Sequence, residues 1–286
     1  MNYIDIAIGR AKDCLEKHLR THPHYLDKDG IARCNVCGEP LEKNTPEIGC
    51  KTMIKCSCDK QKEQEKASRL QREAAETEAM KSPLYDASYN AFTFANDDKA
   101  DKKASDRCRA YVEHWEEVEQ GNYGLLFSGE LGTGKSYYAA AVVNALRNKG
   151  VSSMIVTTSR LLNAIKASKD PQAIIDGLNK FHFVVLDDLG SERDTDYAVE
   201  QLENFVNTRS LAKRPLSVTT NLTGKDLQTP PDLRYARIFD RVREMCSIPV
   251  ILKGESRRIK AAQSRALRGL QILGAKQTDG QTPAAE

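Results

Sequence analysis

The most restrictive feature of this sequence is a phosphate-binding loop. Residues 129–136 read Gly-Glu-Leu-Gly-Thr-Gly-Lys-Ser, the pattern G-x-x-x-x-G-K-S, after an apolar run and before an alanine-rich helical segment. A bound triphosphate needs backbone N–H groups at close approach, a cation over its outer phosphates and a hydroxyl on Mg²⁺. The sequence therefore predicts a site for ATP and Mg²⁺, with Ser136 on the metal, formed by Gly129, Gly132, Thr133, Gly134, Lys135, Ser136 and Tyr137.

A pair of carboxylates follows this loop by about fifty residues. Asp187 and Asp188 end an apolar run, 183–186, that is typical of a buried strand. We expect Asp187 to hold Mg²⁺ and Asp188 to orient and deprotonate the attacking water, the alternative for Asp187 being a helix cap. A further strand ends at Asn221, which we expect to contact the γ phosphate or its water, the alternative being a turn residue.

Apolar runs alternate with helical stretches through the second part of the chain. The runs are rich in β-branched residues and lie at 151–157, 181–186, 216–220 and 248–252. This alternation indicates an α/β fold in which helices cover both faces of a parallel sheet, giving three layers. We assign this ATPase domain to residues 85–270, a helical linker to 61–84 and a polar, disordered tail to 271–286.

Five of the eight cysteines lie between positions 34 and 58. Cys34 and Cys37 have the spacing of a zinc knuckle, and Cys56 and Cys58 supply a second pair of thiols. Four thiolates form a closed tetrahedral Zn²⁺ site with no open position for water, which indicates a structural role. This assignment leaves Cys50 as an extra thiol or as a ligand in place of Cys58.

The region around these cysteines, residues 1–60, is predicted to be a small helical zinc-binding domain that begins with an amphipathic helix. A domain with so little apolar sequence needs a metal to hold it together. His22 and His24 lie near the cluster, but exposed loop histidines are more often neither ligands nor catalysts. We therefore leave both histidines out of the metal site.

Several motifs beyond the phosphate loop resemble those of one family. They read Leu-Asp-Asp-Leu-Gly-Ser-Glu at 186–192, Thr-Thr-Asn-Leu at 219–222, Arg-Ile-Phe-Asp-Arg at 237–241 and Gly-Glu-Ser-Arg-Arg at 254–258. Across about residues 85–262 the chain resembles the AAA+ replicative helicase loaders of the DnaC and DnaI type, with the IstB transposition helpers as close relatives.

This resemblance implies an AAA+ ATPase whose site is completed by arginines. It makes Arg241 an arginine finger that acts in trans, with Arg237 second, and it makes Arg258 the second sensor. An arginine supplied in trans requires head-to-tail self-association, which generates a ring or an open filament. The chain departs from AAA+ proteins at large in having Asp188 where most carry glutamate, which leaves the hydrolysis rate open.

The resemblance also implies the partners, a hexameric replicative DNA helicase and single-stranded DNA, with the N-terminal region on the helicase. Residues 253–276 contain seven basic side chains and one acidic one, and they either neutralise DNA phosphates or form a solvated helical face. Alternative functions are a transposition helper on duplex DNA, an adaptor that binds ATP with little hydrolysis, and a small-molecule kinase.

The overall charge says little about partners, because a net charge of +3 does not by itself indicate a nucleic-acid-binding protein. No apolar run approaches the length of a membrane span, and the N-terminus lacks the pattern of a signal peptide. We therefore expect a cytoplasmic protein without a membrane partner.

Overall fold

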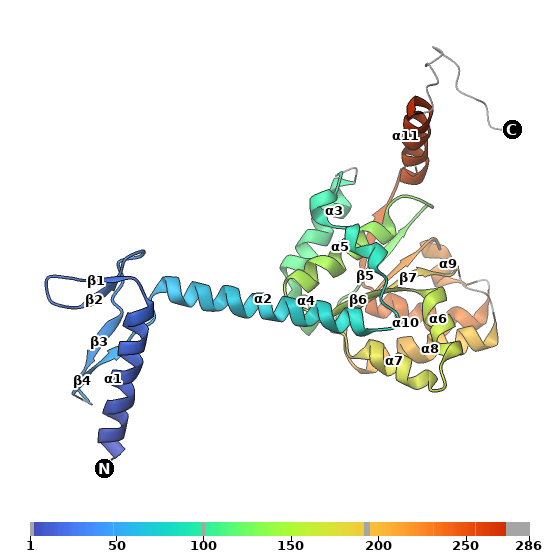
Figure 1. The fold of residues 1–286 in the computed structure, drawn as a ribbon. Coiled ribbons are helices and arrows are strands. Elements are labelled where there is room, and N and C mark those ends of the chain that lie inside the picture. Colours follow the sequence, from blue (N-terminus) through green and yellow to red (C-terminus); the bar gives the residue numbers. More distant parts are fainter. Residues whose placement is uncertain are drawn as a thin grey trace. The chain divides into compact units, whose positions relative to one another are not determined.

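The computed structural model describes residues 3–47, 49–98, 101–191, 195–230, 232–254 and 256–272. The chain divides into two compact units, residues 1–71 and 72–286 (Figure 1). The division falls within one long helix, α2 (Ser57–Lys81), where the sequence predicts a linker. The tail predicted at 271–286 lies outside the described residues from position 273 onward.

Five parallel strands form the central sheet of the second unit. They are β5 (Leu125–Gly129), β6 (Ser153–Thr157), β7 (Phe183–Leu189), β8 (Leu216–Thr220) and β9 (Ile248–Leu252), in the spatial order β6-β7-β8-β5-β9. The predicted parallel sheet is thus confirmed. The strand before the phosphate loop lies beside β8, and β8 lies beside the acidic strand β7. Their carboxyl ends share one edge of the sheet, where open α/β sheets bind ligands.

Helices cover both faces of this sheet, as the alternation of strands and helices predicts (Figure 1). On one face pack α3 (Lys102–Glu113), α4 (Trp115–Gln120) and α5 (Lys135–Asn148). On the other pack α6 (Thr158–Ala167), α7 (Pro171–Asn179), α8 (Asp196–Leu211), α9 (Gly224–Gln228) and α10 (Ala236–Met245). Three short 3₁₀ helices, η1 (Ala87–Ala91), η2 (Phe94–Asn96) and η3 (Leu233–Tyr235), and the last helix, α11 (Arg257–Ile272), complete this unit.

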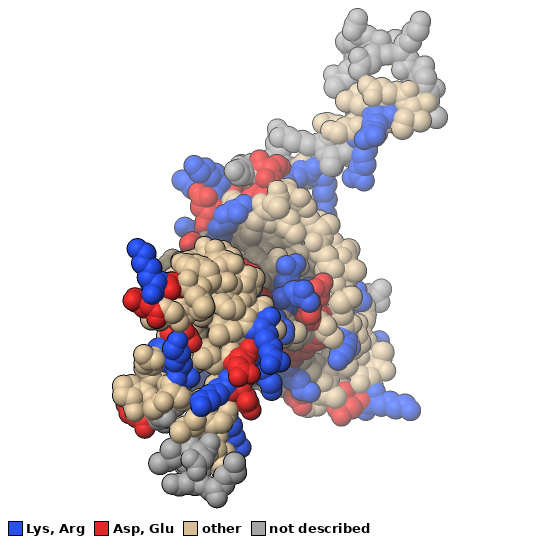
Figure 2. All heavy atoms as spheres, turned by 60° about the vertical axis from the view of Figure 1, so that its left-hand side comes forward, with Lys and Arg blue, Asp and Glu red and all other residues tan. Residues whose placement is uncertain are grey.

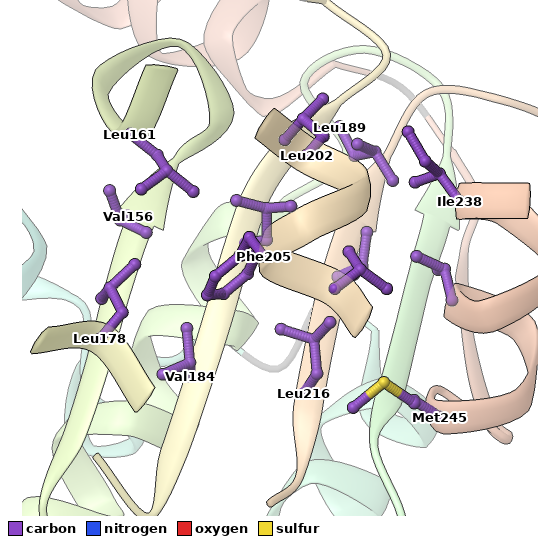
Figure 3. Close-up of a cluster of buried hydrophobic side chains, with 14 of the residues drawn as sticks. Val156, Leu161, Leu178, Val184, Leu189, Leu202, Phe205, Leu216, Ile238 and Met245 are labelled. Carbon is purple, nitrogen blue, oxygen red and sulfur yellow. The ribbon is translucent and has the colours of Figure 1, made fainter. Parts of the chain in front are cut away.

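Two hydrophobic cores explain why the strands are continuous apolar runs. Because successive side chains of a strand point to opposite faces, Val184 lies in the core beneath α8 while Val185 lies in the core beneath α5. Figure 3 shows the first of these cores, where Phe205 of α8 reaches down between Val184 and Leu216 of the sheet. Both faces are buried, so no polar alternation marks these strands.

The first unit contains more strand than the sequence predicts. The expected helix is present as α1 (Tyr3–Thr21), but two antiparallel hairpins follow it: β1 (His24–Leu26) with β2 (Ala32–Cys34), and β3 (Glu42–Thr45) with β4 (Cys50–Met53). The prediction of a helical domain is therefore incomplete, because it leaves out these two hairpins. Strands of three or four residues are too short to show an alternating pattern.

The buried core of this unit is correspondingly small. Its fully buried members are Ala32, Cys34, Leu41 and Cys56, two of which are cysteines. Such a core supplies little hydrophobic stabilisation by itself, which agrees with the expectation of an additional cross-link. Within the described part of the chain, no helix combines the length and the apolar character required to cross a bilayer.

Candidate functional site

The phosphate loop connects β5 to α5 through glycines in conformations that other residues rarely adopt. Gly132 has φ +79° and Gly134, which precedes α5, has φ +104°. A side chain at Gly132 would meet Ser256 Oγ at 2.0 Å, because the chain before α11 passes directly against the loop. The glycines are therefore required both by the turn and by the close approach of a neighbouring segment. The loop places the N-terminus of α5 at the carboxyl edge of the sheet.

Lys135 is the first residue of α5 and is only 7% exposed. Its ammonium donates hydrogen bonds to Gly129 O at 2.8 Å and to Glu130 O at 2.7 Å. Burial lowers the pKa of Lys135, while the nearby Asp188 and Asp187 carboxylates oppose that shift. The lysine is thus held within the loop that would receive the phosphates, facing the acidic pair.

Asp187 and Asp188 lie at the carboxyl end of β7 and are held by Thr219 of β8. Thr219 Oγ1 donates to Asp187 Oδ1 at 2.6 Å and accepts from the Asp188 backbone N–H at 2.8 Å. Asp188 has φ +63°, a left-handed conformation that aspartate tolerates better than most residues. Asn221 Nδ2 donates to Asp188 Oδ1 at 3.1 Å. The predicted acidic pair and the predicted sensor are therefore brought together, and the helix-cap alternative for Asp187 is wrong.

Two further contacts to this acidic pair escape the sequence analysis. One is the contact of Thr219 described above. The other comes from Tyr89 of η1, whose hydroxyl donates to Asp187 Oδ2 at 2.8 Å. Tyr89 lies 98 positions before the aspartate and Thr219 lies 32 after it, so no local motif connects them. The only sequence signal is the place of Thr219 at the end of a strand, two residues before Asn221.

A cavity of about 580 Å³ joins these groups. Its volume suits a small-molecule ligand, and its lining combines the loop, the acidic pair, Asn221 and the basic start of α11. Its lining includes Gly132, Gly134, Lys135, Ser136, Tyr137, Asp187, Asp188, Asn221 and Arg258. Two residues of the predicted nucleotide site, Gly129 and Thr133, are not in this lining. The Gly129 carbonyl accepts a hydrogen bond from Lys135, and the Thr133 hydroxyl donates to Glu130 O at 2.9 Å.

The start of α11 carries a second arginine that the sequence analysis does not assign. Arg257 also lines the cavity, and its backbone N–H donates to Gly132 O at 2.9 Å. Its guanidinium pairs with Asp98 at 3.2 Å and lies 5.4 Å from the centre of the Tyr138 ring. Arg257 thus fixes this part of the chain to the phosphate loop, while Arg258 beside it contributes to the cavity lining.

The two arginines expected to act in trans lie on α10, outside the described lining of the cavity. Arg237 is 83% exposed and pairs with Glu203 at 3.7 Å, and Arg241 is half exposed and pairs with Glu244 at 2.8 Å. Neither contributes to the nucleotide site of its own chain among the described residues. An exposed position on α10 is compatible with contact to another chain.

The cysteine cluster brings together the four thiols that the spacing predicts. The sulfur atoms of Cys34, Cys37, Cys56 and Cys58 all lie within 4.8 Å of one another, whereas Cys50 begins β4 opposite Thr45 and is not in this group. Four thiols that face one another at this separation fit a tetrahedral zinc ion. A hydrogen bond from the backbone N–H of Cys37 lowers the pKa of the Cys34 thiol to about 6.

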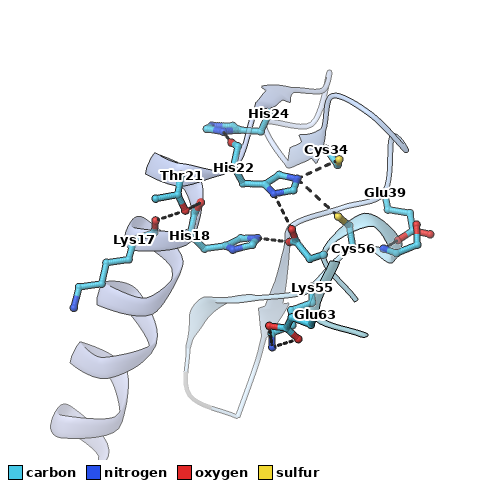
Figure 4. Close-up of polar contacts among 12 residues, drawn as sticks. Lys17, His18, Thr21, His22, His24, Cys34, Glu39, Lys55, Cys56 and Glu63 are labelled. Carbon is cyan, nitrogen blue, oxygen red and sulfur yellow. Dashed lines mark hydrogen bonds and ion pairs between the residues drawn. The ribbon is translucent and has the colours of Figure 1, made fainter. Parts of the chain in front are cut away.

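His22 lies closer to this cluster than the sequence indicates, and it is buried rather than exposed. Figure 4 shows its ring between Cys34, Cys56 and a carboxylate: Nε2 lies 3.2 Å from Cys34 Sγ and 3.8 Å from Cys56 Sγ, and Nδ1 lies 3.0 Å from Asp59. His18 approaches the same carboxylate at 3.2 Å. The expectation of an exposed loop histidine is therefore wrong for His22. Its buried ring contacts two of the four clustered thiols and links them to Asp59.

Basic side chains do not gather into one large patch on the face of the molecule shown in Figure 2. Figure 2 shows Lys and Arg interspersed with Asp and Glu over the face that it displays. The exception is α11, which contains five basic and no acidic residues in Arg257–Ile272. Arg265 and Arg268 of this helix are exposed.

Comparison with known proteins identifies a family and several relatives of this chain. A family model described as IstB-like ATP binding protein matches residues 50–266. The replicative helicase loader DnaC of Escherichia coli (strain K12) is 30% identical over 161 residues, which cover 54% of this chain and 63% of that relative. The uncharacterized protein YdaV of Escherichia coli (strain K12) is 31% identical over 131 residues, which cover 44% of this chain and 52% of that relative. The chain thus spans less than two thirds of the length of these relatives.

A solved structure agrees with these matches. The crystal structure of DnaI superposes with a TM-score of 0.52 at 25% sequence identity, covering 61% of this chain and 94% of that chain. The fold is therefore shared over 61% of this chain with a solved structure of related sequence.

Proposed function

The chain belongs to the IstB-like ATP binding protein family, and on that premise we propose that it is an AAA+ ATPase that loads a hexameric replicative helicase onto single-stranded DNA. The observation that carries the proposal is the shared cavity of the phosphate loop, the acidic pair and Asn221. The family is named for ATP binding, and its relative DnaC is named a replicative helicase loader.

Each side chain of the cavity has a role in this proposal. Lys135 neutralises the outer phosphates, and Ser136 with Asp187 holds Mg²⁺, which supplies positive charge to the phosphoryl group when it is bound. Asp188, held by Asn221 at 3.1 Å, orients the attacking water and takes its proton. Arg258 contacts the nucleotide from the same chain.

The site is completed by another copy of the chain. The charge that spreads over the phosphoryl oxygens in the transition state calls for a further cation, and Arg241 with Arg237 is exposed on α10 to supply it in trans. Head-to-tail contact of this kind generates a ring or a helical filament. Hydrolysis by the isolated chain is then slow and rises on assembly.

The remaining parts of the chain are assigned to the partners. The first unit, stabilised by Zn²⁺ on Cys34, Cys37, Cys56 and Cys58, binds the helicase. The basic side chains of α11 contact phosphates of single-stranded DNA, because this helix has no acidic residue to oppose them.

The experiment that tests this function is co-purification of the full-length chain with the replicative helicase of the same genome. We expect a complex that forms with ATP and transfers the helicase to circular single-stranded DNA, measured as helicase retained on DNA. The unit 72–286 without the first unit should bind ATP but not helicase.

Filaments on duplex DNA without helicase binding would support the other branch of the family instead, a helper of DNA transposition. The family model that matches residues 50–266 is what makes this second function worth testing. Electron microscopy of the chain with ATP and either single-stranded or duplex DNA distinguishes the two outcomes.

A further inference from the structure

Tyr89 makes a buried contact with the nucleotide site that no motif of the sequence indicates. Its hydroxyl donates to Asp187 Oδ2 at 2.8 Å, and the side chain is only 9% exposed although it lines the cavity. The hydroxyl is the donor in this contact, because an ionised carboxylate oxygen can only accept.

The two oxygens of Asp187 are held from opposite sides. Tyr89 donates to Oδ2, and Thr219 donates to Oδ1 at 2.6 Å. A carboxylate that accepts one hydrogen bond on each oxygen cannot rotate freely, and each oxygen keeps a second lone pair. The two donors thus hold in one orientation a carboxylate that lines the cavity.

The segment that carries Tyr89 is itself fixed to the helix of the phosphate loop. Asn144 of α5 donates from its amide to Tyr89 O at 2.9 Å and to Phe92 O at 2.8 Å. Arg160 of α6 donates to Tyr85 O at 2.8 Å and pairs with Asp86 at 2.9 Å. Asn144 and Lys135 belong to one rigid helix, so the Tyr89 hydroxyl has a defined position relative to the loop.

We propose that Tyr89 is a positioning residue for the metal site: it orients the Asp187 carboxylate so that it binds the Mg²⁺ of the nucleotide together with Ser136. This inference rests on the proposed nucleotide site and adds a residue to it. Tyr89 acts on the metal through Asp187 and does not touch the phosphates. Its loss therefore weakens the binding of Mg²⁺ without weakening the binding of the nucleotide itself.

The test is Tyr89→Phe, which keeps the ring that packs against Phe92 and removes only the hydroxyl. Binding of a fluorescent ATP analogue is measured first in EDTA and then in a titration with Mg²⁺. We expect the affinity in EDTA to equal that of the wild type and the Mg²⁺ concentration at half-effect to rise by at least about tenfold, the low end of the effect of losing a hydrogen bond to a charged group.

The matched control is Tyr111→Phe, because Tyr111 is equally buried and its hydroxyl donates to Tyr123 O at 2.7 Å, away from the cavity. This variant should leave both measurements unchanged. Electron paramagnetic resonance of bound Mn²⁺ provides a second readout of the metal in the same complexes. Circular dichroism checks that both variants are folded.

The results separate this inference from the proposed function. An unchanged Mg²⁺ requirement in Tyr89→Phe, or an equal loss of affinity in EDTA, overturns the positioning role. Absence of nucleotide binding in the wild type overturns the nucleotide site itself. If Tyr89→Phe is unstable, Thr219→Val is titrated in its place, and an unchanged Mg²⁺ requirement in that variant contradicts the orientation of Asp187 by its two donors.

Discussion

Lys135 is expected to contact the phosphates of the nucleotide directly, so its loss should affect binding itself. We predict that Lys135→Ala abolishes measurable triphosphate binding, with a loss of at least about a hundredfold, because hydrogen bonds to charged groups are worth about 1.5–3 kcal/mol each. Calorimetry with ATP and Mg²⁺ measures this effect. The control is Lys149→Ala at the other end of the helix, where the ammonium donates to Val112 O at 2.6 Å and faces no phosphate. Wild-type affinity in Lys135→Ala would contradict the site.

Arg241 is expected to affect turnover without affecting binding. The variant Arg241→Ala should bind ATP as the wild type does and lose DNA-stimulated hydrolysis by about a thousandfold, the low end of the effect of an arginine finger. Phosphate release in the presence of single-stranded DNA measures the loss. Arg243→Ala is the matched control, because Arg243 lies on the same helix, is exposed and pairs only locally with Asp240 at 3.0 Å. Full turnover in Arg241→Ala would refute a site shared between chains.

At the scale of structural elements, we expect the two hairpins of the first unit to need a metal cross-link, because their hydrophobic core is small. Among the described residues of this unit, the fully buried members of the hydrophobic core are four, and two of them are predicted metal ligands. We predict that chelation of Zn²⁺ makes residues 1–71 sensitive to protease while ATP binding by the second unit is unchanged. Limited proteolysis and calorimetry on the same samples measure the two effects. Resistance of the first unit to protease after complete metal removal would show that Zn²⁺ has no structural role.

Two serine variants test whether Cys58 or Cys50 is the fourth ligand of the predicted Zn²⁺ site. The structure predicts that Cys58→Ser lowers the Zn²⁺ content of the purified chain and that Cys50→Ser leaves it at one ion per chain, because Cys50 lies outside the group of facing thiols. Atomic absorption measures the content. The reverse pattern would restore Cys50 as the fourth ligand.

At the scale of the whole molecule, the proposed contact with DNA depends on one strongly basic helix, α11, in a chain of nearly balanced charge. A net charge of +3 spread over 286 residues gives little attraction by itself, so the phosphates must be neutralised locally by α11. We predict that affinity for single-stranded DNA falls with salt and that Arg268→Ala reduces the slope of log K against log salt by about 0.7. Fluorescence anisotropy at several salt concentrations measures the slope.

The control for this effect removes charge where no DNA contact is expected. Lys66→Ala on the exposed face of α2 should leave the slope as it is. Affinity that stays flat between low and moderate salt would remove the phosphate contacts from the proposed function.

The local sequence determined the parts of this protein that short-range chemistry specifies. The glycines of the loop, the carboxylates after an apolar strand and the spacing of Cys34 and Cys37 are read from neighbours, because turn geometry and strand burial depend on adjacent residues. For the strands of the large sheet, most ends were predictable to within two residues, since both faces of these strands are apolar. The short strands of the first unit were not, because three residues carry no period.

Only the tertiary structure decided which distant side chains meet. It placed Tyr89 and Thr219 on the two oxygens of Asp187, chose Cys58 over Cys50 as the fourth facing thiol and buried His22 behind Cys34. It also added Arg257 to the cavity. Contacts between positions tens of residues apart follow from how helices and strands pack, and local patterns do not specify which side chains meet. The chemistry of this chain is thus visible in its motifs, whereas the orientation of the groups that perform it is a property of the folded molecule.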